Sequence, residues 1–235
     1  MADLLGTNAR REERMYKEVY VDEEISDRAY NGVIGAVLVY GLLVNVAICY
    51  IFQDRMLYVN PAVLIVGYFV CCIIGMLMSS KSDNAIISFI GYNLVVVPVG
   101  LVVSVSVAFY GGLGSEMVGQ AFIITMLTTA TMAAISFAKP EWFEKLGGVL
   151  FAGLLGLVIS EIVLLIMGSD QVITAWIGAV LFSLYIGYDF HRAQAFPKTL
   201  DNAVDSALDI YLDVINLFLK ILRILGSKGG SKSRR

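Results

Sequence analysis

Six long apolar stretches, separated by short polar segments, dominate the chain between residues 29 and 190. Each stretch is long enough to cross the roughly 30 Å hydrocarbon core of a bilayer as an α-helix. Charged residues fall almost entirely between the stretches or in the two tails. The pattern therefore predicts a helical membrane protein. The predicted spans are 29–52, 62–78, 85–110, 117–138, 146–167 and 172–190.

A further helix, more polar than the first six, is predicted over residues 202–226, NAVDSALDIYLDVINLFLKILRILG. Its polar residues are spaced four, four, three and four positions apart, so they share one helix face. They are Asp205, Asp209, Asp213, Asn216 and Lys220. A carboxylate at mid-membrane costs about 2.5–3.5 kcal/mol even on lenient insertion scales. This helix must therefore lie outside the membrane or be enclosed by the other helices.

Basic residues lie in the N-terminal tail and in alternate loops, which by the positive-inside rule places the N-terminus in the cytoplasm. If the last helix is re-entrant, the basic tail 227–235 stays inside; if it crosses, this tail ends outside. We expect it to cross through the centre of the bundle. The predicted fold is all-α, with six transmembrane helices surrounding a central polar seventh in the bundle 29–226, after a cytoplasmic tail 1–28.

Composition supports a membrane protein and excludes several other classes. The chain is 58% hydrophobic and 16% charged, against about 45–50% and 25% in soluble domains. No basic patch with interleaved aromatic residues is present, so we expect no nucleic-acid partner. The three cysteines lie in apolar runs and His191 is the single histidine, so a metal cluster or zinc site is not expected. With no cofactor motif either, we expect the lipid bilayer as partner, no cofactor and no enzyme activity.

Two acidic residues are the first candidates for function. Asp189 lies at the end of the sixth span, and Asp213 lies about three turns into the last helix, so both could reach a similar depth. Two carboxylates in contact cannot easily both ionise, so such a pair shares a proton and acts as a pH sensor or cation site. The alternative is local pairing, of Asp189 with Arg192 and of Asp213 near Asp209.

Other charged residues extend this hypothesis along the membrane. Glu161 in the fifth span is either a cation ligand on a path or a neutral group bonded within the bundle. Lys220 could pair with Glu161 and close the pore. Asp205 and Asp209 are interpreted first as a solvated mouth and second as an ion funnel.

The run SLYIGYD, followed by ALDIYLDVINLFLKILRILG, resembles the signature of the Bax inhibitor-1 family. The resemblance extends to a proline in the third span and to AKPEWFEKLGGVLFAG, which opens the fifth. It implies six helices around a central seventh. It also implies a pH-sensitive leak of calcium ions, with Asp189 and Asp213 as the sensing pair and calcium site.

Bacterial members of that family carry an arginine-rich end of the second helix that can hold the aspartate pair closed. Here Ser79, Ser80 and Lys81 stand in that place. Lys81 is a candidate substitute for this latch, although it lacks the bidentate fork of arginine. Arg192, three residues after Asp189, is the other candidate.

Three classes of function differ in the residues that they require. A calcium or cation leak fits the acidic residues, because carboxylate oxygens are suitable ligands for hard cations. A regulatory protein that binds a membrane protease or a stress-response partner is the alternative. An intramembrane aspartyl protease is disfavoured, because Ile-Tyr-Leu-Asp replaces the required Gly-x-Gly-Asp and no Pro-Ala-Leu motif follows. The expected location is a bacterial plasma membrane, with a eukaryotic reticulum membrane as the alternative.

Overall fold

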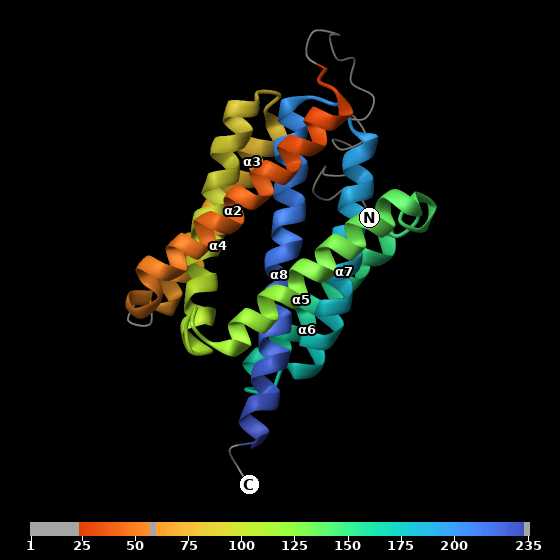
Figure 1. Ribbon diagram of the computed structural model, residues 1–235. Helices are drawn as coiled ribbons and strands as arrows, with labels where there is room; N and C mark the ends of the chain where they lie inside the picture. The colour runs from red at the N-terminus through yellow and green to blue at the C-terminus, as the bar shows by residue number, and fades with distance from the viewer. Residues whose placement is uncertain (1–23, 57–59, 233–235) are drawn as a thin grey trace.

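The structure is a computed structural model that describes residues 24–56 and 60–232 of the chain (Figure 1). The described part contains long α-helices joined by short connections and no strand. The six predicted spans match six of these helices, and the sixth extends five residues further than predicted. The helices are α2 (Asp27–Met56), α3 (Pro61–Lys81), α4 (Ala85–Phe109), α5 (Glu116–Ala138), α6 (Gly147–Ile166), α7 (Val172–Ala195) and α8 (Leu200–Lys232), with a short 3₁₀ turn, η2 (Pro140–Trp142), after α5.

Helix α8 occupies the centre of the bundle. It is one continuous helix of 33 residues, or about 50 Å at 1.5 Å per residue, which exceeds the hydrocarbon thickness. Every residue from Asp201 to Ile224 is buried or half-buried. The last helix therefore runs through the whole bundle instead of turning back, and the predicted central position is confirmed.

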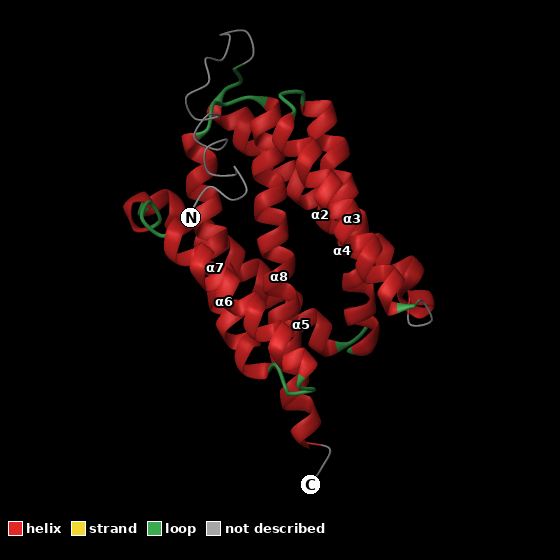
Figure 2. Ribbon diagram, turned by 180° about the vertical axis from the view of Figure 1, so that it is seen from behind, coloured by secondary structure: helices red, strands yellow, loops and turns green. Residues whose placement is uncertain are grey.

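The other six helices form two groups of three on opposite sides of α8. Figures 1 and 2 show α2, α3 and α4 on one side and α5, α6 and α7 on the other. Helices α2 and α4 pack on α8 from the first group, and α5 and α7 pack on it from the second. Within the described residues, the two groups meet mainly where the start of α2 contacts the end of α7, so α8 is the main packing link between them.

The outer helices are apolar on the surface that faces away from α8. All six are long and apolar enough to cross a membrane, whereas α8 is too polar to qualify by composition. Many large apolar side chains on them are exposed, among them Phe69 on α3, Ile166 on α6 and Ile173 on α7. Such a surface is stable against lipid but not against water. The protein is therefore a multi-pass membrane protein whose polar helix is shielded by the others.

The two ends of the bundle are named by a residue in each. At the Lys198 end, α7 ends, residues 196–199 make a connection and α8 begins. The backbone N–H of Ile25 donates to the Lys198 carbonyl at 2.8 Å, and the Tyr30 hydroxyl donates to the Ala193 carbonyl at 3.0 Å. These bonds fix the start of α2 against the α7–α8 connection. The opposite end, where α6 connects to α7, is called the Gln171 end.

Candidate functional site

Helices α7 and α8 pack side by side and bring four charged side chains together. Asp189 and Arg192 are three residues apart on α7, and Asp209 and Asp213 are four apart on α8, so each pair lies on one helix face. The Arg192 guanidinium lies 3.2 Å from Asp189 and 2.5 Å from Asp209. Arg192 therefore links both helices through two carboxylates.

The carboxyl groups of Asp189 and Asp213 meet between the two helices. The two side chains lie close enough to interact, and two carboxyl groups in contact cannot easily both ionise, so the pair shares a proton. Both residues are buried, at 7% and 8% exposed. The Oδ2 atom of Asp213 has no hydrogen-bond donor among the described residues. The predicted contact between the two carboxyl groups is thus present in the structure.

This cluster remains acidic even with a proton shared by the pair. Three carboxyl groups then face a single guanidinium, so one negative charge is left uncompensated. Carboxylate oxygens at such a site can bind a hard cation. However, no group of three or more His, Cys, Asp or Glu side chains is placed to hold a metal ion within the described part of the chain. Among the described residues, Asp189 and Asp213 therefore do not belong to a preformed multidentate cage, and their role as a calcium site stays a prediction.

A second acidic cluster lies at the start of α8. Asp205 accepts a hydrogen bond from the Ser79 hydroxyl of α3, and Asp201 accepts one from the Ser88 hydroxyl of α4 at 2.6 Å. Both carboxylates are buried, at 6% and 8% exposed. The solvated-mouth interpretation is therefore wrong for Asp205, because this carboxylate is buried and bonded to Ser79 of α3. Asp209 remains the more accessible carboxylate, with a third of its side chain exposed.

Asp201 and Ser79 were missed as site residues by sequence reasoning. Asp201 lies four residues before Asp205 and continues the polar stripe of α8, so the same spacing argument could have included it. Ser79 was noted only as standing in the place of a latch arginine. Its hydroxyl instead bonds to an acidic residue of α8, which no local pattern around Ser79 indicates.

The two candidate latch residues differ in position. Lys81 is exposed in the last turn of α3 and forms no ion pair with any described residue. Arg192 contacts Asp189 directly and also faces the Tyr188 ring, with 5.5 Å from the guanidinium carbon to the ring centroid. The structure thus brings Arg192, and not Lys81, to the acid pair.

The charged residues on the polar face of α8 change from acidic to basic toward the Gln171 end. Lys220 forms an ion pair with Glu161 of α6, as expected for these two residues. Arg223 donates to the Gln171 side-chain oxygen, and the Gln171 side-chain nitrogen donates to the Glu161 carbonyl at 3.2 Å. Asn216, between the acidic and basic parts, donates to Leu212 of its own helix at 2.8 Å and is half-buried.

The connection at the Lys198 end is held by a lysine outside the spanning segments. The Lys198 ammonium donates to the Gln194 carbonyl at 2.7 Å and lies 4.6 Å from the centroid of the Tyr30 ring. Burial lowers the pKa of Lys198, while the charge of Asp27 opposes this change. This lysine therefore caps the last turn of α7 by bonding to one of its carbonyl groups.

Comparison with known proteins identifies one family. The family described as inhibitor of apoptosis-promoting Bax1 matches residues 26–230. An uncharacterized protein of Helicobacter pylori is 36% identical over 118 residues, 49% of each chain. Protein lifeguard 4 of Mus musculus is 34% identical over 127 residues, 53% of this chain and 52% of its own length.

A third relative extends over more of the chain. Bax inhibitor 1 of Schizosaccharomyces pombe is 28% identical over 178 residues, 71% of this chain and 62% of its own length. The chain spans about half of the length of the first two relatives. The family match itself reaches from the start of α2 into the end of α8, and so includes both acidic clusters. This protein, whose described residues form a polar helix enclosed by six apolar ones, therefore belongs to the Bax inhibitor-1 family.

Proposed function

We propose that this protein is a pH-sensitive leak channel for calcium ions, controlled by the carboxyl pair Asp189–Asp213. The observation that supports it most is the close approach of two buried carboxyl groups between α7 and α8 of a membrane bundle. Ionisable groups at such depth are costly and are rarely present without a function. The proposed activity is transport of a cation and not catalysis.

The proton on the pair would control how α7 and α8 contact each other. Loss of this proton places two negative charges side by side, which favours either separation of the carboxyl groups or a bound cation. Gain of a second proton removes the charge that Asp189 presents to Arg192 at 3.2 Å. Either change weakens one of the contacts between the two helices, so the permeability depends on pH.

The path of the ion would follow the polar face of α8. Asp205 and Asp209 supply negative charge toward the Lys198 end, and Asn216 continues the polar face beyond Asp213. The ion pair of Lys220 with Glu161 would form the barrier toward the Gln171 end. Two carboxylates without a multidentate cage suit brief binding during permeation better than tight storage of calcium.

The proposed location is a bacterial plasma membrane, with the Lys198 end in the cytoplasm. Relatives in Helicobacter pylori support a bacterial membrane. The orientation is supported by the basic residues that gather at the Lys198 end, because short cytoplasmic loops are enriched in Lys and Arg. They are Lys81, Lys139, Lys145, Arg192 and Lys198.

Flux into liposomes tests the proposal. The purified protein is reconstituted around a calcium-sensitive dye, and entry of calcium is followed from pH 6 to pH 8 for wild type, Asp189→Asn and Asp213→Asn. We expect a pH-dependent leak whose pH dependence is flattened by both changes. Glu144→Gln, on an exposed residue between η2 and α6, is the charge-removal control and should behave as wild type. Absence of flux at every pH from correctly folded protein would refute the channel.

A regulatory role is the alternative, and the name of the relative Bax inhibitor 1 favours it. Such a protein would bind a membrane protease or another membrane protein through its outer surface. Affinity capture with wild type and Asp213→Asn separates the two functions. Binding of one partner that is equal in both variants, together with no calcium flux, supports the regulator.

A further inference from the structure

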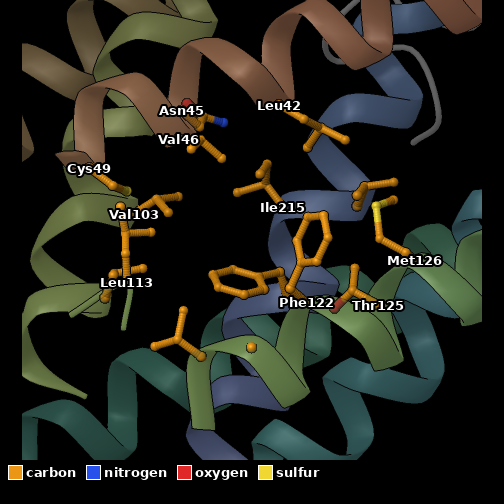
Figure 3. A pocket seen from close by; sticks show the side chains of 15 residues that line it. Leu42, Asn45, Val46, Cys49, Val103, Leu113, Phe122, Thr125, Met126 and Ile215 are labelled. Carbon is orange, nitrogen blue, oxygen red and sulfur yellow. The ribbon is translucent and has the colours of Figure 1, made fainter. Parts of the chain in front are cut away.

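An apolar cavity of about 260 Å³ lies between α2, α4, α5 and α8, in the half of the bundle nearer the Gln171 end (Figure 3). In this view, Leu42 and Val46 of α2 lie opposite Phe122 and Met126 of α5, and Ile215 of α8 lies between them. Almost all of the lining surface is apolar. The cavity thus sits where the two groups of three helices face each other beside α8.

The mouth of the cavity lies between α2 and α5. Among its lining residues, Val46 of α2 and Phe122 of α5 are 47% and 48% exposed, whereas Val107 of α4 and Val214 of α8 are buried. Helices α2 and α5 make little or no direct contact with each other in the described residues. Because both helices cross the membrane, the mouth opens toward lipid tails and not toward water.

The lining residues offer few hydrogen-bond partners for water. Asn45 and Thr125 are the two polar side chains among the lining residues. The Asn45 side-chain nitrogen donates to the Tyr211 hydroxyl at 2.6 Å, and its oxygen lies against Gly100. The Thr125 hydroxyl donates to the Ala121 carbonyl at 2.8 Å. A buried water needs two to four polar partners, so this cavity favours hydrocarbon.

We propose that one acyl chain of a bilayer phospholipid enters between α2 and α5 and occupies this cavity. Apolar cavities of about 150 Å³ stay dry and accept benzene, so the larger volume here accommodates a longer hydrocarbon segment. An empty cavity also loses dispersion contacts on all its walls, which a lipid chain restores. The chain would touch Val214, Ile215 and Phe218, which follow Asp213 on α8.

The site is independent of ion permeation, so its test needs no flux measurement. The full-length protein is placed in phosphatidylcholine vesicles that contain phosphatidylcholine with a photoreactive diazirine on one acyl chain. After irradiation, the attached residues are mapped by mass spectrometry. We expect attachment to the buried residues Val107 and Val214 in addition to exposed ones such as Ile123. Attachment confined to exposed side chains would overturn the proposal. This test uses the wild-type protein alone and does not depend on the folding of a variant.

A glycine at the mouth of the cavity and a second glycine away from it provide a matched pair of variants. Gly119 lines the cavity, and a Cβ built on it meets no atom within 4 Å, so Gly119→Leu places its side chain in the mouth without a clash at Cβ. Gly156→Leu on α6 makes the same change at an equally open glycine away from the cavity. We expect about a tenfold loss of attachment to Val107 and Val214 in Gly119→Leu only, since the leucine takes the space of the lipid chain. Equal attachment in both variants would contradict the proposed route.

Discussion

The ion pair between Glu161 and Lys220 gives a direct test of how α8 is held at the Gln171 end. Lys220→Met removes the charge but keeps an unbranched side chain of similar length beside Gly178 and Leu157, where the lysine stem now lies. Glu161→Gln removes the other charge and keeps the shape. Each single change leaves one charge of the pair inside the membrane without its partner.

The expected magnitude follows from the burial of the two side chains. Removing one partner of a fully buried ion pair costs about 3–5 kcal/mol, whereas exposed pairs contribute roughly 0.2–1 kcal/mol. The Lys220 side chain is 11% exposed and the Glu161 side chain is 25% exposed, so this pair lies between the limits. We expect about 2 kcal/mol of lost stability for each single variant and a coupling of about 1–2 kcal/mol in the double variant.

Reversible unfolding in mixed micelles with increasing dodecyl sulfate measures these free energies. Glu141→Gln, at an exposed residue in η2, serves as the control and should change stability by less than about 0.5 kcal/mol. If the two single effects add to give the double variant within about 0.5 kcal/mol, the two charges do not interact and the reasoning is refuted.

Two further predictions concern the core beside α2. Tyr211→Phe removes the hydrogen-bond partner of the buried Asn45 side-chain nitrogen and should lower the free energy of unfolding by about 1–2 kcal/mol; no change in the same micelle assay would contradict this. Gly41→Ala would place a Cβ against the hydroxyl of Tyr92, a fully buried ring that packs on neighbouring aromatic side chains, so it should cost about 1–3 kcal/mol. A melting temperature equal to that of wild type would show that Tyr92 can move aside.

The helices were predictable because each depends on a local property of the sequence. A continuous apolar run needs a lipid environment wherever it occurs, so the six outer helices were found within a few residues of their bounds. The central position of α8 followed from carboxylates that recur on one face, as Asp205, Asp209 and Asp213 do. Both arguments use only the spacing of neighbouring residues.

Contacts between distant segments were predicted less completely. The partner of Asp205 is Ser79, 126 residues earlier, and that of Asp201 is Ser88, 113 residues earlier. Such pairs depend on the rotation and depth of α3 and α4 relative to α8, which hydrophobic periodicity does not determine. The contact between Asp189 and Asp213 was predicted because the two residues lie on helices that follow each other in the chain.

The cavity was not predicted at all, for a different physical reason. Its lining residues, such as Val107 and Val214, are ordinary apolar residues of spanning helices. A void arises from how far apart α2 and α5 stand across α8, and no residue type marks that distance in the sequence. The choice of Arg192 over Lys81 as the group at the acid pair depended in the same way on helix placement.

The position of α8 between two groups of three helices has a consequence for biogenesis. Of the seven helices, α8 leaves the ribosome last, yet it is the one on which both groups pack. The six earlier helices can enter the bilayer by their own hydropathy, but α8 with its buried carboxylates cannot. Membrane insertion of α8 therefore has to be coupled to assembly. Until it joins, the two groups lack their common packing partner, and their inner faces stay exposed to quality-control proteases.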